Sequence, residues 1–166
     1  TATGTLTASA TPTPTSTATP TPTATATPAP NEITGLGTVI ALVTTSASGA
    51  SKNLEVIRDG DKPSAGTVDS SRQYDSYDGP NISSEDWIGY EYDAPMIFGL
   101  VVFREGMHFA NGGWFETLTV QVRQYGLWRT VPGLRVTPAY PGINNGISFQ
   151  TYQLAFASIV GDAIRI

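Results

Sequence analysis

Acidic and aromatic residues are concentrated between Asp69 and Asp93. Seven acidic residues occur in this stretch against one basic residue, Arg72, and tyrosines and one tryptophan are interspersed among them. Carboxylates form hydrogen bonds with sugar hydroxyls, and flat rings stack on the apolar face of a pyranose. Tyr77 and Asp78 lie in the part richest in turn residues, so we interpret them as loop residues at the rim of a sugar site. A solvated acidic loop without a ligand is the alternative.

A second group of oxygen-bearing side chains lies in the turn Asp-Gly-Asp-Lys-Pro-Ser at positions 59–64. Ca2+ takes six to eight oxygen ligands, and a tight Asp-x-Asp turn can direct two carboxylates and neighbouring carbonyls toward one point. Asp59, Asp61 and Ser64 are therefore candidate calcium ligands. Most Asp-Gly pairs form plain β-turns with solvated carboxylates, and this is the alternative.

Residues suited to nucleophilic or acid–base catalysis are scarce. The chain has one histidine and no cysteine, which excludes disulfides, thiolate zinc sites and a cysteine nucleophile. No Gly-x-Ser-x-Gly motif is present. A glycosidase-like pair of carboxylates stays open, because the separation of such a pair depends on the fold. We expect no catalytic residues, and hence a domain that is not itself an enzyme.

The charge balance limits the possible partners. A net charge of -5 with only nine basic residues disfavours nucleic acid, because binding phosphates requires clustered Lys and Arg. No apolar run reaches the roughly 18 residues that span a bilayer, so no membrane insertion is expected.

Short apolar segments separated by glycine and proline must position these side chains. Leu118, Val120 and Val122 alternate with polar residues, which is the pattern of a half-buried strand. The apolar run 96–103 predicts a strand buried on both faces. Further strands are predicted at 38–44, 54–57, 87–92, 127–131, 148–156 and 163–166. No stretch has a sustained helical period, so we predict an all-β fold, a sandwich or a barrel.

The first 30 residues differ in composition from the rest. They contain 13 Thr, seven Ala and six Pro, with no charged or aromatic residue. Such a segment is an extended spacer with polyproline II character, and dense Thr beside Pro is typical of O-glycosylated stalks. We predict a disordered or extended linker at 1–32, one folded domain at 33–166, and an upstream domain in the same secreted or cell-surface protein. An incidental disordered tail is the alternative.

Four short motifs follow one another along the chain. They are Asp-Gly-Asp-Lys-Pro-Ser at 59–64, Asp-Trp-Ile-Gly-Tyr-Glu-Tyr at 86–92, Gly-Leu-Trp at 126–128 and Ile-Arg-Ile at 164–166. Their order and spacing resemble the galactose-binding-like jelly roll, in particular the family 32 carbohydrate-binding modules and the related discoidin (coagulation factor 5/8 type C) domains. The resemblance covers 33–166 and implies a jelly-roll β-sandwich. The family pattern continues past the Arg-bearing strand, so we expect the last strand to be missing here.

The resemblance also assigns roles to residues. It implies that Asp59, Asp61 and Ser64 hold a structural Ca2+, although the family usually has Thr and then Trp where this chain has Ser64. It places Trp128 in the packed core. Arg165, between two isoleucines, is expected to point away from the apolar face and to pair with an acid.

Sugar-binding members of the family build their site from His, Arg, Asn and an aromatic residue on loops at one end of the sandwich. The loop 104–115 supplies Arg104, His108, Asn111 and Trp114 as candidate ligand residues. Two consecutive glycines before Trp114 would let the backbone turn tightly and present the indole outward. A lone histidine is more often structural, and Trp114 could equally fill the core, so both alternatives stay open.

The resemblance implies a non-catalytic carbohydrate-binding module that brings an attached enzyme or surface protein to a glycan, of galactose type or another polysaccharide. The linker would keep the partner domain near that glycan at a high effective concentration. A discoidin-like adhesion module that contacts protein or a cell surface is one alternative, and a structural spacer domain is another. The acidic region 69–93 disfavours an anionic partner.

Overall fold

The computed structural model describes residues 31–44, 51–79 and 84–166. The linker predicted at 1–32 lies outside these ranges except for its last two residues. The described chain forms strands β1 (Thr38–Ala41), β2 (Ile88–Arg104), β3 (Gln121–Gln124), β4 (Leu127–Thr130), β5 (Arg135–Thr137) and β6 (Thr151–Arg165), with three short 3-10 helices, η1 (Thr34–Leu36), η2 (Leu54–Ile57) and η3 (Ser70–Arg72). These ranges contain no α-helix, and the predicted all-β fold is confirmed.

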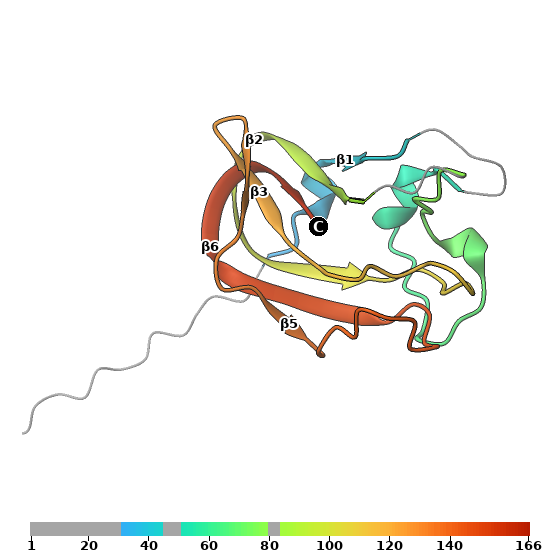
Figure 1. The fold of residues 1–166 in the computed structure, drawn as a ribbon. Coiled ribbons are helices and arrows are strands. Elements are labelled where there is room, and N and C mark those ends of the chain that lie inside the picture. The colour runs from blue at the N-terminus through green and yellow to red at the C-terminus, as the bar shows by residue number, and fades with distance from the viewer. Residues whose placement is uncertain (1–30, 45–50, 80–83) are drawn as a thin grey trace, which may run out of the picture.

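All six strands belong to one antiparallel sheet with the order β1-β2-β6-β3-β4, and β5 also pairs with β6. β5 pairs with residues 153–155 of β6 and β3 pairs with residues 163–165, so both lie along the edge of β6 that β2 leaves free. β6 curves as a long arc between these two pairings (Figure 1). The sheet therefore wraps around its own core, as the layers of a β-sandwich do.

Each of the two longest strands joins segments that the sequence presents as separate strands. β2 contains the predicted strands 87–92 and 96–103 almost entirely, and β6 contains most of 148–156 and 163–166. The register between β2 and β6 shifts between Glu91 and Met96 and again between Phe98 and Leu100. Pro95 lies in the first shift, where a missing backbone N–H does not interrupt a ladder. The predicted breaks are therefore bends within continuous strands.

The core lies between the curved halves of the sheet. Its buried side chains come from β2, β3, β6, the segment before β3 and the residue after β4: Tyr92, Phe98, Phe103, Leu118, Val120, Val122, Val131, Tyr152, Leu154 and Ile164. The predicted alternation at 118–122 is confirmed, because Val120 and Val122 are completely buried. The prediction that both faces of 96–103 are buried is wrong: Ile97 is 72% exposed and Val102 is 50% exposed. In this antiparallel sheet only one face of β2 covers the core.

The strand predicted at 54–57 is wrong, because these residues form the 3-10 helix η2. The side chain of Asn53 accepts a hydrogen bond from the Glu55 backbone N–H at 3.2 Å, and the Glu55 carboxylate pairs with Arg58 at 2.8 Å. These contacts span only two or three residues, so capping stabilises a helical turn over an extended strand.

The outer face of the sheet carries an arginine between two tryptophans. The Arg165 guanidinium lies 5.0 Å from the ring centre of Trp87 and 4.5 Å from that of Trp128. It also approaches Glu85 at 3.5 Å, as expected for an outward-facing arginine paired with an acid. Trp128 is half-buried against this cation and is not part of the buried core. Gly89 is required opposite Arg165, because a Cβ there would lie 2.0 Å from the Ile164 carbonyl oxygen.

Candidate functional site

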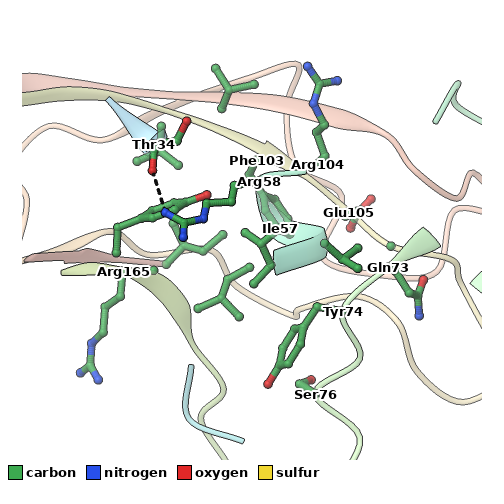
Figure 2. A pocket seen from close by; sticks show the side chains of 18 of the residues that line it. Thr34, Ile57, Arg58, Gln73, Tyr74, Ser76, Phe103, Arg104, Glu105 and Arg165 are labelled. Carbon is green, nitrogen blue, oxygen red and sulfur yellow. Dashed lines mark hydrogen bonds between the residues drawn. The ribbon is translucent and has the colours of Figure 1, made fainter. Parts of the chain in front are cut away.

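A large cavity opens between the segment 51–79, β2 and the loop 104–115. Its volume is 1940 Å³. The segment 51–79 is anchored to the N-terminal part of the domain, because the Arg58 guanidinium donates to the Gly37 carbonyl and the Tyr74 hydroxyl donates to the Val43 carbonyl. Figure 2 shows Arg58, Gln73 and Tyr74 around this cavity, together with Phe103 and Glu105 from the end of β2 and the residue after it.

The cavity brings together most of the residues that the sequence indicates as a sugar site. Five of the six candidate ligand residues line it: Tyr77, Asp78, Arg104, Asn111 and Trp114. Tyr77 and Asp78 belong to one loop. The other three residues belong to the loop 104–115, at least 26 positions later in the chain. The sixth candidate, His108, does not line the cavity and lies behind its wall.

The wall formed by residues 74–79 and Asp86 is rich in carboxylates and rings. The Lys52 ammonium donates to the Tyr77 carbonyl oxygen at 2.6 Å, and Asp75 accepts from the Tyr77 backbone N–H at 2.8 Å, so the loop is held from both sides. Asp86 lines the same wall, and its buried Oδ1 atom has no hydrogen-bond partner in the described part of the chain. Burial raises the pKa of Asp86, and the nearby carboxylates of Asp75 and Asp78 act in the same direction.

The loop 104–115 depends on a glycine to present Trp114. Gly113 has φ +101°, and a Cβ there would lie 2.4 Å from the Met107 carbonyl oxygen. The backbone N–H of Phe109 donates to the Gly112 carbonyl at 2.8 Å, which closes the loop just before the tryptophan. Trp114 is half-buried and lines the cavity. The expected tight glycine turn is therefore present, and it sets the indole at the cavity wall rather than in the buried core.

His108 occupies a buried polar cluster rather than the cavity surface. Its side chain is 3% exposed, its Nδ1 atom lies 3.1 Å from Asn144 Oδ1, and its Nε2 atom lies 3.4 Å from Glu105 Oε2. The imidazole packs edge-on against the indole of Trp114, with ring centres 5.8 Å apart. This placement fits the structural alternative for His108: the ring supports Trp114 from behind.

Glu105 is a residue that sequence reasoning missed. Its side chain is 2% exposed, and its Oε1 atom accepts a hydrogen bond from the Tyr140 hydroxyl at 3.0 Å. Burial raises the pKa of Glu105, and Tyr140 and His108 oppose that effect. A carboxylate next to Arg104 in the sequence suggests a solvated loop. The only available signal was its position directly after a strongly apolar strand.

The candidate calcium ligands Asp59, Asp61 and Ser64 lie in an exposed turn. The Asp61 carboxylate is held on both oxygens by Arg72, with Nε at 2.6 Å from Oδ2, and Asp59 Oδ1 accepts from the Asp61 backbone N–H at 2.8 Å. The Ser64 carbonyl accepts from Thr67. This donor set does not fit Ca2+, which takes six to eight oxygens, unless the ion displaces Arg72 from Asp61. Calcium binding stays a prediction, tested by metal content and by melting with and without chelator.

The described ranges contain no cluster of three or more His, Asp or Glu side chains suited to holding a metal ion. They also contain no helix long and apolar enough to cross a membrane. The arrangement of the cavity is suited to recognition, because rings, carboxylates and amides line a common space. In comparisons with known proteins, no family model, curated protein or solved structure matches this chain.

Proposed function

We propose that this domain binds a glycan in the cavity between residues 51–79, β2 and the loop 104–115, and that it does so without catalysis, as the family 32 carbohydrate-binding modules that it resembles do. One observation carries the proposal: five residues selected from the sequence for sugar chemistry line the same cavity, which extends over much of the described chain. Its 1940 Å³ exceeds the roughly 300–1,000 Å³ of a typical small-molecule pocket, so there is room for several sugar rings.

The lining supplies both parts of sugar recognition. Trp114 and Tyr77 offer rings for the C–H face of a pyranose, and Asp78 and Asp86 offer carboxylate oxygens to its hydroxyls. The unpartnered Oδ1 of Asp86 gains most from such a hydroxyl, since a buried acceptor without a donor is costly.

The benefit of such binding lies in tethering. Single sugar contacts are weak, but a secreted protein that carries this domain on a Thr- and Pro-rich linker keeps its other domains close to a polysaccharide.

A glycan array on the whole chain tests the proposal, with Trp114→Ala as the site variant and Tyr125→Asn as its control. Tyr125 is exposed, does not line the cavity and has φ +51°, a conformation that Asn adopts readily. We expect Trp114→Ala to weaken binding about tenfold, near the upper range for an aromatic contact. Tyr125→Asn should leave it unchanged. Binding that survives Trp114→Ala would contradict the cavity as the site.

A discoidin-like adhesion module is the second candidate, and the β3–β4 hairpin favours it. Tyr125 is 100% exposed at the tip and Leu127 follows it on the surface. Exposed apolar tips of this kind contact proteins or cell surfaces in the domains that this chain resembles. The same two variants separate the candidates, because adhesion at the tip would be lost in Tyr125→Asn and kept in Trp114→Ala. No glycan bound at all would favour a structural spacer.

A further inference from the structure

Two buried polar atoms face each other behind the cavity wall. Glu105 Oε2 and His108 Nε2 are 3.4 Å apart, and neither has a hydrogen-bond partner in the described ranges. Both side chains are almost completely buried, so their contact with bulk water is slight. Such a pair of atoms needs an explanation, because nearly all buried polar atoms in proteins are satisfied.

The tautomer of His108 follows from its other nitrogen. Nδ1 lies 3.1 Å from Asn144 Oδ1. The orientation of the Asn144 amide is determined twice: its Nδ2 donates to the Phe109 carbonyl at 3.1 Å, and its Oδ1 accepts from the Gly146 N–H at 2.9 Å. Because Oδ1 can only accept, His108 Nδ1 must carry a hydrogen. In the neutral ring Nε2 then has a lone pair, and that lone pair points toward Glu105.

We propose that Glu105 and His108 share one proton between Oε2 and Nε2, and that this proton fixes the loop 104–115 in the conformation that carries Trp114 and so regulates the glycan site. Without the proton, a carboxylate and an imidazole lone pair would face each other in a dry environment, which is strongly unfavourable. With it, the two groups form one charge-assisted hydrogen bond. The regulatory part rests on the proposed function, whereas the shared proton does not.

The Glu105–His108 pair is connected to Trp114 in two ways. The His108 ring packs directly on the indole. On the other side, the Tyr140 hydroxyl donates to Glu105 Oε1 and accepts from the Phe115 backbone N–H at 2.9 Å. Both the side chain of Trp114 and the backbone that follows it therefore depend on the pair.

The sign of the pH dependence follows from burial. Burial raises the pKa of Glu105 and so favours retention of the proton. The stabilisation is present at mildly acidic pH and is lost as pH rises and the proton leaves to water. The other titratable groups that face Glu105 are Tyr140 and Tyr152; burial raises the pKa of Tyr152 to about 12 and that of Tyr140 further, so both stay neutral throughout.

The single histidine of the chain makes the proton directly observable. In the ¹⁵N-labelled protein we expect His108 Nδ1 to carry a hydrogen and the Nε2 resonance to report the loss of the shared proton as pH rises. Glu105→Gln keeps a donor toward Nε2 and an acceptor for Tyr140 but removes the carboxylate that shares the proton, so the pH-dependent change of the wild-type Nε2 resonance should be lost. Glu116→Gln, on the exposed surface of the next segment, should titrate like the wild type.

A neutral histidine with its hydrogen on Nε2 in the wild-type protein would overturn the shared proton, and so would identical titrations of wild type and Glu105→Gln. For regulation, we expect wild-type glycan affinity to fall at least about fivefold from pH 6 to pH 9, a coupling usual between linked sites, and Glu105→Gln to stay constant. A wild-type affinity that is unchanged over this range overturns regulation. If no glycan binds, the proposed function is wrong, but the ¹⁵N spectrum of His108 still shows whether Glu105 and His108 share a proton.

Discussion

Trp114 has two environments at once. One edge of its indole meets the buried His108 ring, and the residue also lines the cavity. A ring supported from behind loses little conformational freedom when a ligand stacks on it, which is the advantage of a preorganised site. The polar cluster of Glu105, His108 and Tyr140 is therefore best understood as the support of this ring, and the cavity-facing residues as the contact surface.

Asp86 provides a residue-scale prediction about pH. Its ordinary pKa is 3.8 and burial raises it in the folded protein, so the neutral form is favoured and the charged form costs stability at neutral pH. The folded protein should gain stability as pH falls through the raised pKa. We expect Asp86→Asn to stabilise the protein at pH 7 by about 1 kcal/mol, because a neutral amide is less costly to bury than a carboxylate near Asp75 and Asp78. Thermal melts at acidic and neutral pH measure this gain.

Asp162→Asn is the matched control with the opposite sign. Arg123 holds the pKa of Asp162 below its usual range through a hydrogen bond at 2.8 Å. The Asp162 carboxylate thus stabilises the fold at neutral pH and loses that contribution in acid. If the two variants shift the melting temperature in the same direction at pH 7, the account of Asp86 is wrong.

At the scale of elements, the segment 51–79 forms a cavity wall without any strand. It contains only the short helices η2 and η3, and its hydrogen bonds to the rest of the domain include Arg58 to the Gly37 carbonyl, Tyr74 to the Val43 carbonyl and the Gly66 backbone N–H to the Ser148 carbonyl. A wall held by few bonds opens more readily than a strand in a sheet. The cavity can therefore admit a ligand by local movement of this segment.

Arg58→Met tests the attachment. It keeps an extended apolar side chain but removes the donors to Gly37 and the ion pair with Glu55. We expect amide hydrogen exchange in residues 53–58 to accelerate about tenfold, because a hydrogen bond from a charged group contributes roughly 1.5–3 kcal/mol and part of it is regained from water. Arg135→Met on β5 is the control and should leave these amides unchanged. Equal exchange in both variants would show that the segment is anchored elsewhere.

The elements show what the sequence could and could not predict. Alternation identified the half-buried residues at 118–122, and the overall β character followed from short apolar runs between glycines and prolines. The sequence did not predict that β2 continues through Pro95, because a bend within one strand and a loop between two strands have the same local composition. The helical turn at 54–57 was missed because the Asn53 cap and the Glu55–Arg58 pair outweigh an apolar run of four residues.

Some residues of the candidate site could be predicted from the sequence, and others could not. Residue type alone singled out Tyr77, Asp78 and Trp114, because ring and carboxylate chemistry is a property of the side chain. The role of Glu105 depends on Tyr140, 35 positions later, and on the burial of both groups. A contact between residues so far apart in the sequence forms only when the chain folds, so no local sequence pattern predicts it.

At the scale of the whole molecule, the sheet serves as a rigid frame and the loops at its edge form the site. β2 and β6 pair over most of their length, and β2 continues directly into the loop that carries Trp114. The outer face has its own tryptophans, Trp87 and Trp128, which are stacked on Arg165. Of the three tryptophans, Trp114 lines the cavity, whereas Trp87 and Trp128 do not and are linked to it only through Arg165, which does.

This separation allows a direct test of glycan binding in the cavity. In the ¹⁵N-labelled protein, each tryptophan contributes one indole N–H signal. The signals can be assigned with single Trp→Phe variants and followed while the strongest glycan from the array is added. We predict that the Trp114 signal shifts and saturates with glycan, whereas the signals of Trp87 and Trp128, which do not line the cavity, shift less. A saturable shift of Trp87 or Trp128 with Trp114 unchanged would contradict the account.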